Sequence, residues 1–297
     1  GIIVTEAAYH GNTSAVTEVS PSSFKKGSLP EHVHVIPISQ MPEQADPSAW
    51  FADQVRAGVA RLDALGYGCA ALLVDSIFSS DGVYAAPAGF LKPAVEWLQA
   101  QGALLIADEV QPGFGRTGTG MWGFARHQVT PDVVTMGKPM GNGFPMAGLA
   151  AREELLAALN EDVGYFNTFG GSTVAVAAGM AVLDVLAEEA LIANARQQGD
   201  YLKQQLEGLQ STFEEVAAVR GAGLFIGLDL CNPARDGAPD AARITAVINA
   251  LKRKGVLIGA AGKTGSTLKI RPPLCIARAE ADLFLDRLEQ SIRATAG

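Results

Sequence analysis

The apolar run at residues 103–107 is the feature that most constrains how this chain can fold. It contains no polar residue, it follows Gly102, and it ends at Asp108. A short run that is apolar at every position is typical of a strand buried on both faces of a parallel sheet. Because open α/β sheets bind ligands at the carboxyl ends of their strands, Asp108 is expected at a ligand-binding edge.

Strand and helix patterns alternate over the first two-thirds of the chain. Strands are expected at 70–74, 132–136 and 148–151, and helices at 91–98 and 174–189. The first of these helices has apolar residues at the i, i+3, i+4, i+7 spacing of a buried helix face. This alternation predicts an α/β fold, with a mostly parallel sheet and helices on both faces.

The pattern changes in the last third, which predicts a small C-terminal α+β domain. We expect a polar helix at 197–212, a strand at 223–230, an amphipathic helix at 244–251, a strand at 268–270 and a closing helix at 281–292. The expected boundary divides the chain into a large domain at 1–205 and a small domain at 206–297.

Composition and charge exclude several classes of protein. The 297 residues are 48% hydrophobic and 18% charged, which is typical of a compact globular protein. The net charge is −8 and basic residues do not cluster, so no nucleic-acid partner is expected. No apolar stretch has the length of a membrane span, so no membrane partner is expected. Cys69, Cys231 and Cys275 lack metal-ligand spacing, which favours reduced thiols in a cytoplasmic protein and no metal site.

Lys138 is a second candidate residue at the same edge. It follows the expected strand at 132–136, as Asp108 follows the strand at 103–107. A lysine after a strand is ordinarily a solvated surface residue. An acid and a lysine on neighbouring strand ends, however, can hold opposite sides of one flat cofactor. Pyridoxal phosphate requires that pair, because the lysine forms a Schiff base and the acid keeps the pyridine nitrogen protonated.

Six motifs carry a family resemblance and together span the chain. They are AYHGNT at 8–13, DEVQ at 108–111, GFGRTG at 113–118, MGKPMGNGFP at 136–145, YFNTFGG at 165–171 and LKIRPPL at 268–274. In this order they resemble the class III (ω-amino) aminotransferases. The nearest branch holds alanine–glyoxylate aminotransferase 2-like enzymes and ethanolamine-phosphate phospho-lyases. The resemblance implies a fold-type I enzyme that depends on pyridoxal phosphate.

The resemblance also implies roles for four residues around the cofactor. Lys138 would bear the Schiff base and later carry a proton between substrate and cofactor, and Asp108 would bond the pyridine nitrogen. Val110 would pack on the ring, and Gln111 would reach the ring hydroxyl. Without the family motif, Asp108 could be no more than a cap for the segment after it.

The motif near the start of the chain adds three cofactor-binding candidates. By resemblance Tyr9 stacks on the cofactor ring, His10 belongs to the same stacking motif, and Gly11 leaves room for the ring. On composition alone, Tyr9 would more commonly be a core aromatic residue.

Two later motifs concern the partner subunit and the substrate. The resemblance implies that Thr168 donates to the cofactor phosphate of the other subunit, which predicts a homodimer with shared active sites. Without the resemblance, Thr168 would be interpreted as a hydroxyl at the end of a strand with no functional role. The planar fork of Arg271 suits a carboxylate, which amino-acid donors and oxo-acid acceptors share. The alternative for Arg271 is a structural salt bridge.

Two nucleotide-binding patterns are false matches. Gly113-x-Gly115-x-x-Gly118 has the spacing of the dinucleotide fingerprint, but the sequence after it does not open a helix. Lys263 lies in a Gly-Lys-Thr triplet, yet the first glycine of a phosphate loop would fall at Leu257.

Two departures from the family pattern limit what can be carried over. Asp75-Ser76 stands where many relatives have Glu-Pro, and Ser80 stands where ornithine-type enzymes place a glutamate that gates the arginine. We therefore predict an aminotransferase that moves an amino group from an amine or amino acid to an oxo acid, with donor and acceptor unspecified. The alternatives are a phospho-lyase acting on an amino-alcohol phosphate, and a non-catalytic fragment.

The start of the chain supports the last alternative. A strand pattern begins at once at residues 1–6, without a methionine. Relatives carry a further region before this strand, including a Gly/Ser-rich turn and helix that hold the cofactor phosphate. We therefore expect this chain to lack the N-terminal region of the family.

Overall fold

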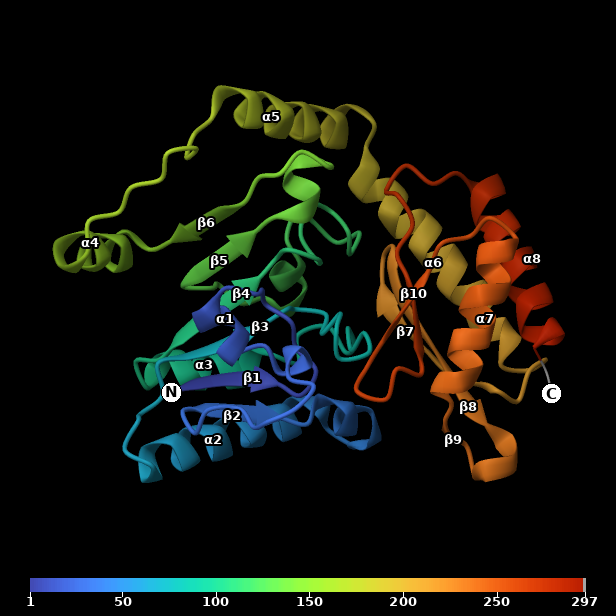
Figure 1. Cartoon of the computed structure of the whole chain (residues 1–297), viewed down its shortest axis with the longest axis horizontal. Helices are drawn as coiled ribbons and strands as arrows, with labels where there is room; N and C mark the ends of the chain where they lie inside the picture. Colours follow the sequence, from blue (N-terminus) through green and yellow to red (C-terminus); the bar gives the residue numbers. More distant parts are fainter. Residues whose placement is uncertain (296–297) are drawn as a thin grey trace.

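The computed structural model describes residues 1–295, which form a larger and a smaller part (Figure 1). The larger part is built on a six-stranded sheet with the order β2-β1-β3-β4-β5-β6. Its strands are β1 (Ile2–Thr5), β2 (Val33–Ile36), β3 (Ala71–Val74), β4 (Leu104–Asp108), β5 (Val133–Met136) and β6 (Gly148–Ala151). The first five pair in parallel, as the apolar runs predicted.

Only β6 runs antiparallel to its neighbour β5 in this sheet. The connection between them holds the short 3₁₀ helix η4 (Lys138–Gly141) and a turn. A parallel crossover requires a dozen or more residues and usually a helix, so the chain turns back antiparallel here. The sheet is therefore mostly parallel, and the predicted fold class is confirmed.

Two crossover helices pack on the sheet and on each other. They are α2 (Pro47–Ala64) and α3 (Lys92–Ala100), and they share one buried core with β1, β3 and β4. The rings of Phe51 and Phe90 meet edge to face in this core, with their centroids 5.5 Å apart. At the start of α2 the Asp46 carboxylate accepts a hydrogen bond from the backbone N–H of Ala49, which caps the helix.

The remaining segments of the larger part lie at its margins. They are α1 (Ser14–Glu18), the 3₁₀ helices η1 (Pro21–Ser23), η2 (Ile38–Glu43) and η3 (Gly123–His127), α4 (Glu153–Asp162) and α5 (Thr173–Glu188). Figure 1 shows the chain after β6 leaving the sheet towards α4 and returning over its upper side as α5. α4 buries none of its residues.

The smaller part is an antiparallel sheet with helices on one side. Its strands are β7 (Val216–Ala222), β8 (Phe225–Asn232), β10 (Gly259–Ala261) and β11 (Thr267–Ile270), in the order β10-β11-β8-β7, with β9 (Ala238–Pro239) paired to β8. Its helices are η5 (Pro233–Arg235), α6 (Leu191–Leu209), α7 (Ala241–Arg253) and α8 (Arg278–Ala294). Figure 1 shows this sheet between the large sheet and the helices α7 and α8. The expected α+β part is thus present.

Sequence analysis missed β7 and placed α6 too late in the chain. β7 is rich in alanine and glycine, and a bulge between Val216 and Ala218 breaks its alternation. Such composition has little strand propensity, so β7 depends on pairing with β8. α6 begins six residues before the expected start at 197, and Leu202 and Leu206 pack into the core of the smaller part. The domain boundary after residue 205 falls within this helix and remains a prediction.

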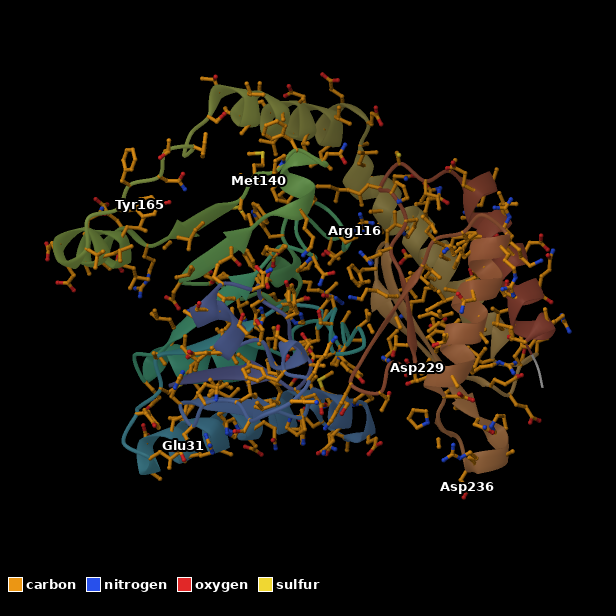
Figure 2. The ribbon with its side chains drawn as sticks, viewed as in Figure 1. Glu31, Arg116, Met140, Tyr165, Asp229 and Asp236 are labelled. Carbon is orange, nitrogen blue, oxygen red and sulfur yellow. The ribbon has the colours of Figure 1, made fainter. Side chains whose placement is uncertain are left out.

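The second and third glycines of the false dinucleotide fingerprint, Gly115 and Gly118, lie where the two parts meet. A Cβ on Gly118 would lie 2.7 Å from the backbone nitrogen of Arg196 in α6. A Cβ on Gly223, between β7 and β8, would lie 2.4 Å from the carbonyl carbon of Thr117. Figure 2 shows Arg116 between the two parts, where its guanidinium donates to the carbonyls of Leu224 and Pro272. The motif therefore permits a close backbone-to-backbone contact, hereafter the glycine seam.

Candidate active site

Asp108 and Lys138 lie at the carboxyl ends of adjacent parallel strands. Asp108 is the last residue of β4 and pairs with Thr135 of β5, and Lys138 opens η4 just beyond β5. Lys138 is exposed and has a φ of +36°. A left-handed backbone is uncommon for residues other than glycine and recurs at functional sites. The turn after β5 thus presents the lysine amine to solvent beside a buried acid.

The carboxylate of Asp108 is held at both oxygens. Nδ1 of His10 lies 2.8 Å from Oδ2 and donates to it, and the backbone N–H of Val110 donates to Oδ1 at 3.0 Å. Val110 also stands next to Lys138, because a Cβ on Gly137 would find the Val110 methyls at 3.7 Å. The structure therefore brings His10, Asp108, Val110 and Lys138 to one edge.

The segment that carries His10 contains the other two candidates of its motif. Nε2 of His10 is buried and has no hydrogen-bond partner among residues 1–295. Tyr9 is not in the core but 43% exposed, so its ring is available for a ligand. Gly11 has a φ of +146°, and a Cβ there would lie 3.0 Å from Val16 Cγ1. Gly11 therefore allows the chain to turn sharply after His10.

Gln111 is tied to a second acid, Asp75, through a serine. The amide of Gln111 donates to Ser79 Oγ, and that hydroxyl donates to Asp75 Oδ2. The backbone N–H groups of Ile77 and Ser79 also donate to the Asp75 carboxylate, at 2.9 and 3.0 Å. Burial, and then the neighbouring charge of Asp108, raise the pKa of Asp75. Asp75, a departure from the family pattern in the sequence, thus lies next to the predicted site.

Glu109 is directed elsewhere and holds a loop in place. Its carboxylate accepts hydrogen bonds from the backbone N–H groups of Gly123 at 2.7 Å and Phe124 at 2.9 Å. Burial raises the pKa of Glu109 to about 7. The adjacent acids Asp108 and Glu109 therefore have different structural roles. Asp108 faces the edge of the sheet, whereas Glu109 holds the start of η3.

Lys269 is a residue near this edge to which sequence analysis gave no role. It lies on β11 of the smaller part, yet its pKa is lowered to about 8, first by burial and then by the charges of Arg271 and Lys138. The charges of Asp75 and Asp81 act on it in the opposite direction. No local pattern in the sequence signalled this, because the sheet of one part faces the strand ends of the other.

Arg271 follows β11 directly and is exposed. Neither Arg271 nor Lys269 forms an ion pair within 4 Å among residues 1–295, which removes the support for a structural salt bridge at Arg271. Both residues line a cavity of about 640 Å³ that extends to Glu280 and Phe284 of α8. Asp108 and Lys138 do not line that cavity, so it adjoins the edge rather than containing it.

Thr168 lies apart from the other candidates, on the connection between α4 and α5. This connection is exposed, with Phe166 86% and Phe169 84% accessible. Figure 2 shows Tyr165 projecting from the same connection, away from the two sheets. No hydrogen bond joins Thr168 to the other candidates among the residues described.

Residues 1–295 contain no group of three or more His, Cys, Asp or Glu side chains arranged to hold a metal ion. No helix in that range is long and apolar enough to cross a membrane.

Comparison with known proteins identifies the family. The family model "Aminotransferase class-III" matches residues 1–292. The chain belongs to the class III aminotransferases. A Drosophila melanogaster protein named alanine–glyoxylate aminotransferase 2-like is 36% identical over 298 residues, which cover 96% of this chain and 60% of the relative. A Caenorhabditis elegans protein named ethanolamine-phosphate phospho-lyase homolog 1 is 37% identical over 297 residues, which cover 92% and 63%. The chain thus spans about 60% of the length of these relatives.

Solved structures agree with this family. A phospholyase from Arthrobacter in complex with phosphoethanolamine superposes with a TM-score of 0.91 at 37% identity, covering 99% of this chain and 71% of that one. A Bacillus anthracis aminotransferase gives a TM-score of 0.86 at 28% identity, covering 99% and 69%. An aminotransferase and a phospholyase therefore share this fold.

The residues at the edge of the sheet fit pyridoxal phosphate, the cofactor of class III aminotransferases. An exposed lysine amine and a buried acid come from neighbouring strand ends, which is the donor set that the cofactor requires. His10 Nδ1 donates a hydrogen bond to the Asp108 carboxylate from beside it. The other ring nitrogen of His10, Nε2, is buried and has no hydrogen-bond partner among residues 1–295. Asp108, Lys138, Val110 and Tyr9 are thus the residues of this chain that would hold the ring.

The bond between His10 and Asp108 should be measurable as stability. Replacing His10 with Ala removes a donor from a buried carboxylate, so unfolding in urea should cost about 1–3 kcal/mol less than for the unchanged chain. His32→Ala is the matched control, because His32 Nε2 is 3.6 Å from Glu18 in a pair that is exposed on both sides. Such pairs contribute about 0–1 kcal/mol. Equal losses in the two variants would contradict the assignment.

Proposed function

We propose that the protein to which this chain belongs is an aminotransferase dependent on pyridoxal phosphate, which moves an amino group from an amine or amino acid to an oxo acid. The observation that carries the proposal is that Asp108 and Lys138 lie at the carboxyl ends of the adjacent parallel strands β4 and β5. Membership of the class III family supports it. Because the chain spans about 60% of its relatives, the activity of the whole protein is inferred.

In this proposal Asp108 would hold a proton and Lys138 would move one. Asp108, kept in place by His10 and the Val110 N–H, would hold a proton on the pyridine nitrogen. When bound, the cofactor supplies an electron sink for the charge that develops on the substrate carbon. Lys138 would attach the cofactor and then move a proton through its amine, since its side chain is exposed at this edge.

Other residues of this chain would position the ring and the substrate. Tyr9 offers an accessible aromatic face for stacking, and Gly11 leaves room beside it. Gln111 reaches the ring hydroxyl in this proposal, with its amide oriented by Ser79. The unpaired guanidinium of Arg271 would bind the carboxylate of the amino-acid donor or of the oxo acid.

We further propose that the protein is a homodimer with shared active sites, in which Thr168 binds the cofactor phosphate of the partner subunit. The support is the connection between α4 and α5, which exposes Tyr165, Phe166 and Phe169 together. Sedimentation equilibrium should give twice the chain mass, and Phe166→Asp should shift the protein towards monomer. A monomer before any substitution would contradict this proposal.

A cytoplasmic location is likewise a proposal. It is supported by Cys69, Cys231 and Cys275, which are all free thiols. Relatives from Arabidopsis thaliana and Homo sapiens carry the word mitochondrial in their names, so cell fractionation with an antibody against this chain is the deciding measurement.

Attachment of the cofactor should occur at Lys138. After incubation with pyridoxal phosphate and reduction by borohydride, peptide mapping should find the adduct on the peptide that contains Lys138. Lys138→Ala should abolish the adduct. Lys263→Ala is the control, because Lys263 is exposed and pairs with Glu6. An adduct on Lys263 or Lys269 would contradict the assignment of Lys138. The absence of any adduct would favour a non-catalytic fragment.

A phospho-lyase is the second candidate function, favoured by the Caenorhabditis relative and by the Arthrobacter structure. The two functions differ in their need for an acceptor. The transaminase should consume an amino donor only when an oxo acid is supplied. Arg271→Ala should lower kcat/KM for the oxo acid about ten- to a hundredfold, from the loss of one charge-assisted contact. Arg278→Ala, which removes an exposed arginine stacked on Tyr201, should leave it unchanged. Inorganic phosphate released from phosphoethanolamine without an oxo acid would identify the phospho-lyase instead.

A further inference from the structure

Gln111, Ser79 and Asp75 form a series of hydrogen bonds, hereafter the amide relay, across the ends of β3 and β4. Gln111 stands three residues after β4, and Asp75 directly follows β3. These strands are paired neighbours, so the two segments leave the sheet side by side. Ser76 Oγ crosses the same gap to the Glu109 carboxylate, at 3.3 Å. The loop after β3 is therefore tied twice to the segment after β4.

The hydrogen bonds of the amide relay have a fixed direction. A serine hydroxyl has one hydrogen, and the hydroxyl of Ser79 donates it to Asp75 Oδ2. Ser79 Oγ can then only accept from Gln111, so the NH₂ end of the Gln111 amide must face it. Ser79 has an exposed fraction of 0%, so bulk water does not compete for its hydroxyl. The orientation of the amide thus follows from the bond that Ser79 makes to the acid.

Asp75 can set this direction because the hydrogen bonds to its carboxylate within residues 1–295 are all donated to it. Besides the Ser79 hydroxyl, the backbone N–H groups of Ile77 and Ser79 donate, at 2.9 and 3.0 Å. Three donors stabilise the ionised form of a carboxyl group. If Asp75 gained a proton, its O–H could donate to Ser79 Oγ, and the Ser79 hydrogen would be free for the oxygen of the Gln111 amide. The relay would then run in the opposite direction.

Charged groups act on Asp75 from several sides. Burial, and then the charge of Asp108, raise the pKa of Asp75. The charge of Asp75 in turn raises the pKa values of Asp81 and Glu109, so these acids repel it. The amine of Lys269, in the smaller part, attracts it. The three donors of its own loop and this amine are therefore the groups that favour the ionised carboxylate.

We propose that Asp75 and Ser79 are positioning residues that fix, through Gln111, which end of the Gln111 amide meets the ring hydroxyl of the cofactor. The inference rests on the proposed function, in which Gln111 reaches that hydroxyl. The hydroxyl is adjacent on the ring to the aldehyde group that Lys138 would attach. A contact of fixed orientation there would set how readily the attached group gains or loses a proton.

Proton exchange of the Gln111 amide tests the relay in protein without cofactor. Glutamine labelled with ¹⁵N in its side chain gives NMR signals for each amide, and Gln111→Ala identifies those of Gln111. One Gln111 amide proton should exchange with solvent about tenfold more slowly in the unchanged protein than in Ser79→Ala. Asp75→Asn should lose most of the same difference, because it has no charge and one acceptor oxygen for three donors. Ser80→Ala is the matched control, since Ser80 bonds to Gly262 through its backbone carbonyl.

Absorbance of the bound cofactor tests the effect on the ring. In protein loaded with pyridoxal phosphate, Gln111→Ala should move the pH midpoint of the spectral change by about 0.5–1 pH unit, and Ser79→Ala should move it by a similar amount. If Ser79 acts through Gln111, Ser79→Ala should add no further shift in the Gln111→Ala background. Ser80→Ala should leave the midpoint in place.

Two results would overturn the positioning role. One is exchange of the Gln111 amide that is the same in Ser79→Ala or Asp75→Asn as in the unchanged protein. The other is a midpoint shift by Ser79→Ala that persists in full without Gln111, which would show a structural effect on the site. Borohydride mapping separates these failures from that of the proposed function. Slow exchange without an adduct on Lys138 overturns the proposed function and the role towards the ring, whereas an adduct without slow exchange overturns the positioning alone.

Discussion

The burial of carboxylates at the carboxyl edge of the parallel sheet is the constraint on which the candidate site depends. Asp75, Asp81, Asp108 and Glu109 are gathered there. Burial raises the pKa of Asp75, Asp81 and Glu109, and hydrogen bonds hold both oxygens of Asp108. Each acid is stabilised by donors from a loop, as when Thr5 Oγ1 and the Ala7 N–H donate to Asp81 at 2.7 Å each. The loops at this edge are therefore folded around the acids, and their shape determines where a ligand can enter.

The strand ends could be predicted from the sequence because their signal is local. An uninterrupted apolar run that ends in an acid has few structural interpretations, and β3, β4 and β5 lie where the runs placed them. Neighbouring parallel strands then bring their ends together, so the position of Asp108 and Lys138 at one edge of the sheet could be predicted from pattern and topology alone. The roles around the cofactor came from the family resemblance, which local pattern could not supply.

The residues that sequence reasoning missed depend on contacts between distant segments. Lys269 alternates with apolar residues on β11 like any solvated lysine, and only the packing of the small sheet against the strand ends gives it an altered environment. The link from Gln111 through Ser79 to Asp75 crosses more than thirty residues of sequence. β7 was missed for the complementary reason, since its weak propensity is overridden by pairing with β8.

The glycine seam has a consequence for how proteins with this fold can diverge. Where backbone rests on backbone, no side chain can shrink or rotate to let the two parts turn relative to each other. The placement of Lys269 and Arg271 relative to Lys138 therefore depends on a contact between main chains rather than on side chains that vary. Relatives with this seam would diverge by exchange of individual side chains at positions such as 269 and 271, while the main-chain contact between the two parts is kept.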